Sequence, residues 1–313
     1  MRIFVAGATG AIGQPLVRQL IEAGHDVTGM TRSPAKATWL REAGAGAVVC
    51  DALDAQATKE AVHACGPELV IDQLTDLPKK ANAFRFNRFY DRQNQLKKKA
   101  PLALLEAAVE VGARRHIMQG VAFTYDPGAS SEGIHAEDDP QYKDPPKPWD
   151  EALPPFAISE QRVIEEPSLE GIVLRYGFFY GPGTHMASDG SLAADVRRRR
   201  YPIVGGGGVY SFIHVADAAG ATLLAAEAGK AGAYNVVDDK PLPVREWLPS
   251  YAEALGAKPP RRVPAWLARL TTGPIPTHFS TTLRGASNAK LRESLEWEPE
   301  YPDPREGFVR ALG

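Results

Sequence analysis

The sequence predicts an α/β fold, built on a doubly wound parallel sheet with a smaller C-terminal domain beside it. Short apolar runs alternate with amphipathic segments between residues 2 and 74. The connections between these segments are short, as in sheets whose parallel strands are joined by crossover helices. The chain of 313 residues is longer than an average domain, so a second and smaller unit is expected.

The N-terminal part of the chain supplies strands and helices in alternation. Short apolar runs predict strands at 2–6, 26–30, 47–50 and 69–74. Apolar residues at helical spacing predict helices at 13–23, 38–43 and 55–64. Beyond them, helices are predicted at 101–111 and 159–165, and strands at 116–122 and 171–176. This order is typical of a parallel sheet with helices on both faces.

The rest of the chain is less regular. Residues 126–155 are rich in Pro, Asp, Gly and Ser, and we expect a long surface loop there. A strand is predicted at 209–213, followed by helices at 215–227 and 244–255. Residues 257–282 are rich in Pro and Thr, and are expected to wrap over a site as a lid.

Composition excludes several classes of partner. The chain has 36 basic and 38 acidic residues and a formal net charge of -2, so neither nucleic acid nor a membrane is expected as a partner. The basic runs 97–99 and 197–200 lack aromatic platforms and are interpreted as solvated surface. Cys50 and Cys65 fit no disulfide scaffold or metal site, so no metal is expected. The chain opens on a strand rather than a leader, which favours a cytoplasmic location.

A glycine-rich turn joins the first strand to the first helix. It reads Gly7-Ala-Thr-Gly10-Ala-Ile-Gly13. In such a turn one glycine permits the bend, one lets a diphosphate approach the backbone, and one packs the helix on the strand. The helix N-terminus adds free N–H groups and a positive dipole end. The turn therefore predicts a Rossmann fold that binds a dinucleotide.

The end of the second strand favours NADP(H) over NAD(H). A cofactor with a free ribose 2′-hydroxyl calls for an acidic residue there. The sequence instead has Arg32 followed by Ser33, and a guanidinium can fork onto a 2′-phosphate. Asp51 follows the third strand, where it could meet the adenine edge or cap the next helix.

Several segments together resemble the extended short-chain dehydrogenase/reductase family, also called the NAD-dependent epimerase/dehydratase family. They are the glycine turn and residues 50–54, 104–108, 174–183, 212–219 and 234–239. The resemblance implies a Rossmann domain over 1–182, to which 209–237 return, and a substrate-binding domain or lid over 183–208 and 238–313. The cofactor contacts expected on this basis are Gly7, Thr9, Gly10, Ala11, Ile12, Gly13, Arg32, Ser33, Asp51, Ala52, Leu74, Gly120, Gly177, Phe178 and Phe179.

The catalytic positions of the family are not filled in the usual way. Family members typically use a Ser or Thr together with the Tyr and Lys of a Tyr-x-x-x-Lys helix. In this sequence Val121, Phe156 and Glu160 occupy those three positions. A phenyl ring has no proton to donate, and a carboxylate would raise rather than lower the pKa of a neighbouring phenol. The chain therefore resembles an atypical member, in which the weak substitute donors are Tyr125, Ser159, Tyr180 and His185.

Three functional interpretations follow. The first is an NADPH-dependent reductase of a ketone on a bulky aromatic small molecule, as in atypical members that act on polyketide (angucyclinone-type) ketones. Such a substrate would stabilise its own alkoxide, because hydride transfer is the chemistry of the cofactor. The C-terminal third, with Trp247, Trp266 and Phe279, is large enough to line an apolar pocket.

The second interpretation is a non-catalytic NADP(H) sensor, and fold alone does not separate it from an enzyme or from a structural or RNA-associated role. A nucleotide-sugar epimerase or dehydratase is weaker still, because those reactions need the missing acid–base pair. The oligomeric state is expected to be a monomer or homodimer.

Overall fold

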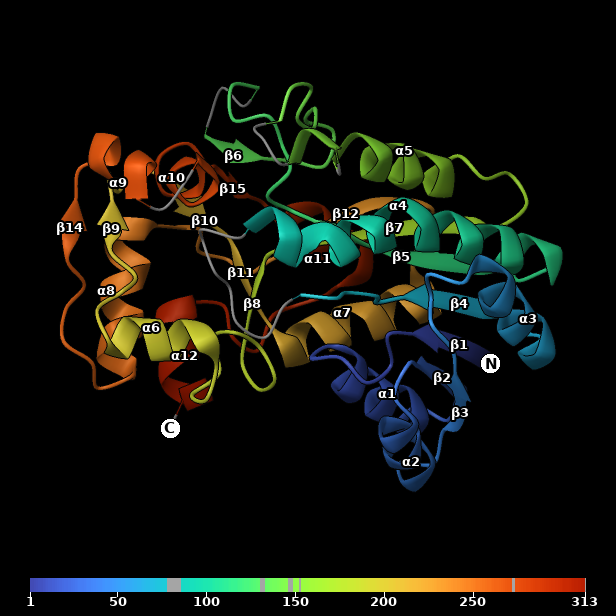
Figure 1. The fold of residues 1–313 in the computed structure, drawn as a ribbon. Coiled ribbons are helices and arrows are strands. Elements are labelled where there is room, and N and C mark those ends of the chain that lie inside the picture. The colour runs from blue at the N-terminus through green and yellow to red at the C-terminus, as the bar shows by residue number, and fades with distance from the viewer. Residues whose placement is uncertain (78–85, 130–132, 146–148, 152, 272–273, 313) are drawn as a thin grey trace.

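Seven parallel strands form the centre of the molecule (Figure 1). The computed structural model describes residues 1–77, 86–129, 133–145, 149–151, 153–271 and 274–312. The strands lie in the order β12-β7-β5-β4-β1-β2-β3. Their bounds are β1 Arg2–Ala6, β2 Asp26–Thr31, β3 Gly46–Val49, β4 Leu69–Asp72, β5 Arg115–Val121, β7 Glu170–Tyr176 and β12 Gly232–Val236. The predicted α/β Rossmann fold is confirmed.

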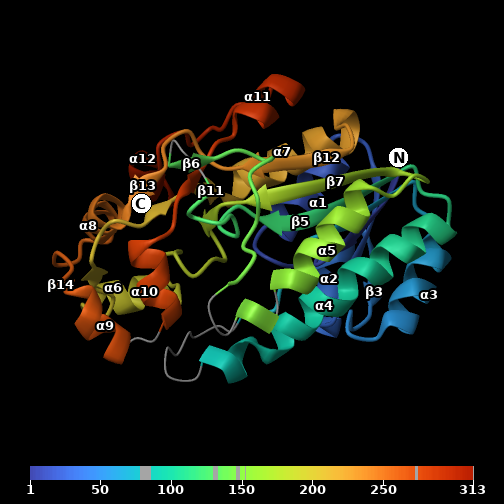
Figure 2. The ribbon, with the colours of Figure 1, turned by 90° about the horizontal axis from the view of Figure 1, so that it is seen from above.

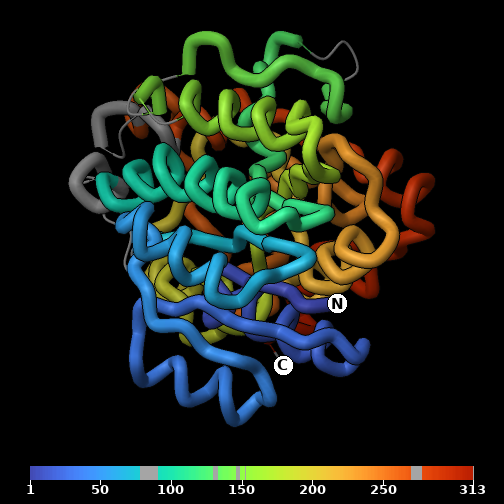
Figure 3. Tube along the Cα trace, turned by 90° about the vertical axis from the view of Figure 1, so that its right-hand side faces the viewer, coloured from blue at the N-terminus to red at the C-terminus, as the bar shows by residue number. Residues whose placement is uncertain are grey.

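Each face of the sheet has its own apolar core, because successive strand side chains point to opposite faces. In β1, Ile3 and Val5 pack in one core, and Phe4 and Ala6 in the other. One face is covered by α3 Ala55–Cys65, α4 Phe86–Glu110 and α5 Leu153–Ile164. The other is covered by α1 Gly13–Glu22, α2 Pro34–Glu42, α7 Val215–Ala228 and α11 Ala289–Leu295. Figures 2 and 3 show α4 and α5 in one layer and α1 and α2 across the sheet from them.

The helix α4 is much longer than predicted. The sequence pattern placed its start at Pro101, a residue that suits the first turn of a helix. The structure instead begins the helix at Phe86 and carries Pro101 in its interior. Leu96, Ala100 and Leu104 pack into the core under the sheet, and this burial outweighs the backbone bond that proline removes. The helix prediction from 101 was therefore wrong at its N-terminal end.

A third core lies beyond the carboxyl ends of the strands, on the left in Figure 1. Its elements include α6 Ser191–Arg197, α8 Val244–Ala254 and α12 Pro304–Leu312. The strand predicted at 209–213 is two strands, β10 Val209–Tyr210 and β11 Phe212–His214. They are separate because β10 pairs with β13 Leu242–Pro243, whereas β11 pairs with β8 Phe178–Tyr180.

The segments expected as loop and lid carry short elements. Within 126–155 lie β6 Ile134–His135 and the one-turn helix Trp149–Glu151. Strand β6 pairs with β15 Gly285–Ala286, which ties this segment to the C-terminal part. Within 257–282 lie β14 Arg262–Val263, paired with β9 Ile203–Val204, and the helices α9 Ala265–Thr271 and α10 Pro274–Thr281. In the part of the chain that the structure describes, no helix is long and apolar enough to cross a membrane.

Candidate active site

The turn between β1 and α1 has no room for side chains at two of its glycines. Gly7 has a φ of +83°, and a Cβ there would lie 2.4 Å from the carbonyl oxygen of Gln73. A Cβ on Gly13 would lie 2.3 Å from the carbonyl oxygen of Gly7. At Gly10 the nearest atom to a Cβ, the Gly7 oxygen, is 3.3 Å away. Gly7 and Gly13 are thus needed by the fold, whereas Gly10 keeps the cavity beside it open.

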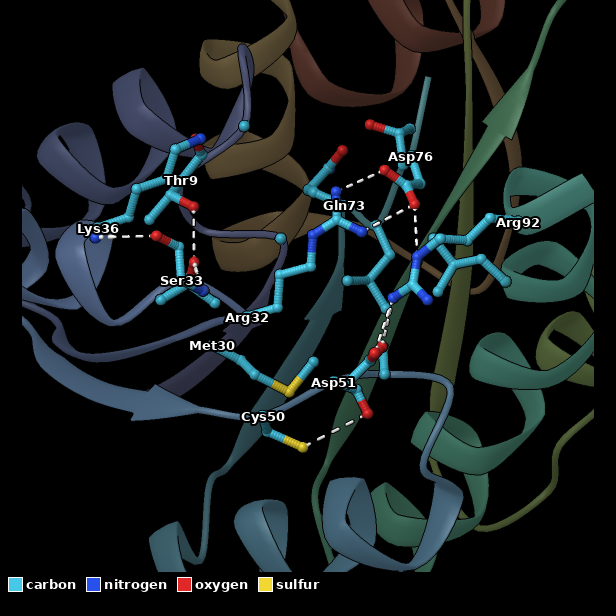
Figure 4. A pocket seen from close by; sticks show the side chains of 17 residues that line it. Thr9, Met30, Arg32, Ser33, Lys36, Cys50, Asp51, Gln73, Asp76 and Arg92 are labelled. Carbon is cyan, nitrogen blue, oxygen red and sulfur yellow. Dashed lines mark hydrogen bonds and ion pairs between the residues drawn. The ribbon is translucent and has the colours of Figure 1, made fainter. Parts of the chain in front are cut away.

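That cavity has a volume of about 350 Å³ and runs from the turn past the ends of β2, β3 and β4 to α4 (Figure 4). Its lining includes eight of the residues expected to contact a cofactor: Gly7, Thr9, Gly10, Arg32, Ser33, Asp51, Ala52 and Leu74. Lys36, Gln73, Asp76 and Arg92 also line it. The cradle of close backbone and small residues fits a dinucleotide diphosphate.

The other expected contacts lie elsewhere along the same side of the sheet. Ala11 and Ile12 precede α1, which begins at Gly13. Gly120 lies in β5, where a Cβ would meet Glu160 Oε1 at 2.6 Å. Gly177 follows β7, and Phe178 and Phe179 lie in β8. Their contact with a cofactor stays a prediction.

Two arginines and two aspartates form a connected cluster at the far end of the cavity (Figure 4). Arg32 donates to both carboxylate oxygens of Asp76 at 2.8 and 2.6 Å. Arg92 bonds both oxygens of Asp51 at 2.8 Å, and its Nε lies 2.6 Å from Asp76. The guanidinium of Arg32 lowers the pKa of Asp76, and that of Arg92 lowers the pKa of Asp51.

This cluster brings an arginine to the site that sequence reasoning missed. Arg92 comes from the unpredicted half of α4, so no pattern indicated that it faces the cavity. Lys36 also lies there, with its ammonium donating to the carbonyl of Thr9 at 3.2 Å. Asp51 does not cap α3; Asp54 does, accepting from the N–H of Ala57 at 3.0 Å.

The positions of the family's proton-transfer residues are apolar or salt-bridged. Val121 ends β5, and Phe156 on α5 is buried in the core. Glu160 is buried, accepts from Arg175 Nε at 2.9 Å and accepts from Gln141 at 2.6 Å. Burial raises the pKa of Glu160, and the guanidinium of Arg175 acts in the opposite direction. No hydroxyl or phenol stands at these three positions.

Of the four substitute donors suggested by the sequence, Tyr125, Ser159 and His185 are hydrogen-bonded to other groups of the protein. The hydroxyl of Tyr125 donates to Asn235 at 2.6 Å and accepts from Arg175 at 2.9 Å, and burial raises its pKa to about 12. Ser159 bonds the carbonyl of Pro155 one turn back in its helix.

Tyr180 is buried in the third core, where its hydroxyl has no hydrogen-bond partner among the described residues. His185 is bonded to Ser191 at 2.8 Å, and burial lowers its pKa. A catalytic role for any of these residues stays a prediction.

Four half-buried aromatic side chains gather between β5, β8 and the C-terminal segments. We name Phe123, Trp149, Phe178 and Phe279 the aromatic wall. Phe123 stacks on Phe178 with ring centroids 4.5 Å apart, and Phe279 meets Trp149 edge-on at 4.8 Å. Phe279 also lies edge-on to Phe178 at 5.6 Å.

The residues of the aromatic wall differ from the aromatic residues that the sequence predicted to line an apolar pocket. Trp247 is buried within the third core, and Trp266 is 68% exposed, so only Phe279 of the expected trio belongs to the wall. The wall also includes Trp149, which lies in the segment expected as a surface loop. His278 precedes Phe279 on α10, and its Nε2 is hydrogen-bonded to the hydroxyl of Tyr142. This pair supplies titratable groups that sequence reasoning did not identify.

Comparison with known proteins fits this geometry. Residues 3–237 match the model of the NAD dependent epimerase/dehydratase family. The chain belongs to this family. A reductase from a Streptomyces species, named 3-diazoavenalumate denitrifying reductase, is 42% identical over 99% of this chain and 100% of its own. The family match and the similarity to this reductase show that the protein is an oxidoreductase. The glycine cradle indicates a nicotinamide dinucleotide as its cofactor.

Solved structures of the family share the fold over nearly the whole chain. UDP-glucose 4-epimerase of Thermus thermophilus, solved with NAD, is 25% identical with a TM-score of 0.72, covering 99% of this chain and 97% of that one. A human epimerase family protein solved with NADPH is 18% identical with a TM-score of 0.74, covering 99% of each chain. The latter likeness shows the fold alone.

Proposed function

We propose that this protein is an NADP(H)-dependent reductase of a flat aromatic small molecule whose electron-poor group accepts a hydride without a proton from the enzyme. One observation carries the proposal. Phe156 and Val121 stand where the family places its hydroxyl groups, and Glu160 is held by Arg175 rather than facing a substrate. A carbonyl with no internal stabilisation would leave a developing alkoxide unprotonated in such a site.

The preference for NADP(H) rests on the cations that line the cavity. Arg32, Lys36 and Arg92 are among its lining residues, and β2 ends without a carboxylate. Guanidinium groups recognise phosphate oxygens in a bidentate manner, so a 2′-phosphate would draw Arg32 and Arg92 away from their aspartates. When bound, the nicotinamide supplies the hydride.

The aromatic wall favours a planar aromatic substrate. Phe123, Phe178 and Phe279 contribute ring faces and edges, and aromatic pairs of this geometry gain energy beyond area burial. The side chains are half-buried, so apolar surface stays available to a ligand. A planar aromatic ring fits this surface better than a sugar, whose hydroxyls would need polar partners.

The electron-poor group that best suits the site is an arenediazonium. Hydride addition to such a cation, with loss of dinitrogen, gives the arene and consumes no proton. The Streptomyces relative is named as a denitrifying reductase of a diazo compound. The missing acid is then no defect, because the reaction balances without one.

The test is NADPH consumption with a panel of aryl diazonium salts, aromatic ketones and quinones. We expect consumption with a diazonium salt and the matching arene as product. Replacing Trp149 by Ala should raise KM for that substrate about tenfold, since truncating a packed aromatic contact costs about 1–2 kcal/mol. The exposed Trp266→Ala is the matched control. No NADPH consumption with any member of the panel would contradict the proposal.

A ketone is the second candidate, favoured by one observation. The Tyr142–His278 pair could donate a proton, and His278 directly precedes Phe279 on α10. Burial raises the pKa of Tyr142, so the phenol carries its proton but is a weaker acid than a free tyrosine. In this case Tyr142→Phe should lower kcat for ketones about a hundredfold and leave diazonium reduction unchanged. Equal rates of ketone reduction by Tyr142→Phe and the wild type would eliminate Tyr142 as the donor.

A further inference from the structure

A half-buried lysine lies beside the positions of the missing catalytic pair. The side chain of Lys97 extends from α4, and its ammonium sits 5.0 Å from the centroid of the Phe156 ring. Its Nζ donates to the side-chain carbonyl of Gln119 on β5 at 3.3 Å. The sequence pattern placed Lys97 in a solvated basic run, and that interpretation is wrong for Lys97. Helices α4 and α5 pack together, which puts Lys97 against Phe156 (Figure 2).

The hydrogen-bonding capacity of Lys97 and of the groups around it is only partly used. An ammonium has three donors, yet among the described residues its one hydrogen-bond partner is a neutral amide. The carboxylates of Asp72 and Glu160 lie close enough to act on its charge, but neither forms an ion pair with it within the described ranges. Asp72 Oδ2 and Glu160 Oε1 are themselves buried without a partner there. Open donors and open acceptors thus lie in one cluster.

The cluster adjoins the dinucleotide cavity. Gln73 and Leu74, which follow Asp72, line that cavity, as does Leu96 beside Lys97. The side-chain oxygen of Gln73 is also buried without a partner in the described part of the chain. Ammonium donors next to carboxylate and amide acceptors match a ligand that both accepts and donates hydrogen bonds, as a vicinal diol does.

We propose that Lys97 binds the ribose hydroxyls of the nicotinamide half of the cofactor, delivering from α4 the cation that Glu160 replaces on α5. The inference rests on the proposed function, since it requires a nicotinamide dinucleotide in the cavity. Pro101 lies one turn further along α4, where an interior proline removes the helix bond to the carbonyl four residues earlier, which is that of Lys97. Burial lowers the pKa of the Lys97 ammonium, and Asp72 and Glu160 oppose this shift.

The experiment compares two ligands by calorimetric titration without substrate. One is NADPH, and the other is adenosine diphosphate carrying a 2′-phosphate, which lacks the nicotinamide nucleoside. We expect Lys97→Met to raise the Kd of NADPH about tenfold or more, the loss of a charge-assisted hydrogen bond. The Kd of the adenine half should not change. Lys97→Gln, which keeps a donor, should fall between Lys97→Met and the wild type.

The matched control is Lys99→Met, because Lys99 is exposed on the same helix. It should bind both ligands as the wild type does. Equal NADPH affinity in the wild type and both Lys97 variants would overturn the inference, and so would equal weakening of both ligands. If the wild type itself fails to bind NADPH, the proposed function fails instead, so the two failures are distinguishable.

Discussion

At the scale of single residues, the exchange of a cation for a carboxylate at Glu160 changes what that position does. Glu160 and Arg175 form a buried pair, and Arg175 also donates to the carbonyl of Glu137 and to the hydroxyl of Tyr125. The hydroxyl of Tyr125 continues to Asn235 on β12. The position therefore joins α5, β7 and β12 rather than serving a substrate.

Removing one member of this pair leaves the other charge buried and unpaired. We expect Arg175→Met to lower the free energy of unfolding by about 3–5 kcal/mol, measured by urea denaturation. Arg162→Met, an exposed arginine on α5, is the control and should change stability by less than about 0.5 kcal/mol. A loss below about 1 kcal/mol in Arg175→Met would show that the pair is not buried as described.

The other prediction at this scale concerns cofactor preference. Replacing Arg32 by Ala removes a guanidinium that the structure holds over the cavity through Asp76. The Kd of NADPH should rise about 10–100-fold, because hydrogen bonds to charged groups contribute about 1.5–3 kcal/mol, while that of NADH stays within a factor of two or so. Arg18→Ala, an exposed arginine on α1, is the matched control. Parallel loss of both nucleotides would show that Arg32 does not read the 2′-phosphate.

At the scale of elements, α4 decides how much of the site the sequence could reveal. The β1 turn was predictable, because only glycine fits at Gly7 and Gly13 and glycine is visible in a sequence. The first half of α4 was not, because its polar residues and Pro101 contradict local rules and are overridden by packing against the sheet. Arg92, which lines the cavity, and Lys97, which we propose binds the cofactor, lie on that half, so both were missed. Trp149 and Tyr142 were missed because long loops carry no periodic signal.

The proline in α4 supplies a prediction at this scale. Pro101→Ala restores a backbone bond to the carbonyl of Lys97 and removes the ring from the helix interior. We expect the free energy of unfolding to rise by about 1–3 kcal/mol and NADPH affinity to fall as the Lys97 backbone shifts. Urea denaturation and calorimetry measure the two effects. Unchanged NADPH affinity in a stabilised Pro101→Ala would show that the helix bond removed by Pro101 does not affect the position of Lys97.

At the scale of the whole molecule, two cores hold the sheet and a third lies beyond its carboxyl edge, with the dinucleotide cavity against that edge. Both faces of β5 are covered, so a polar side chain buried in this strand is costly. His116, the second residue of β5, has no exposed surface, and burial lowers its pKa to about 4. Neither of its ring nitrogens has a hydrogen-bond partner among the residues described.

Acid stability follows from this histidine. Below its ordinary pKa of 6.5, the unfolded chain takes up a proton that the folded chain does not accept until the pH falls to about 4. The folded state should therefore lose about 3 kcal/mol across this window. His116→Leu should flatten the dependence of Tm on pH between these values. Equal slopes for the variant and the wild type would show that His116 is not the group responsible.

We infer that a nicotinamide dinucleotide lies against the turn between β1 and α1. Calorimetric titration of NADPH into the wild type and into Gly10→Ala tests this placement. The variant should fold, because the added methyl meets only the Gly7 oxygen at 3.3 Å, but it projects into the cavity. We expect saturable binding to the wild type and at least about tenfold weaker binding to a folded Gly10→Ala. Undiminished binding to that variant, or none to the wild type, would contradict it.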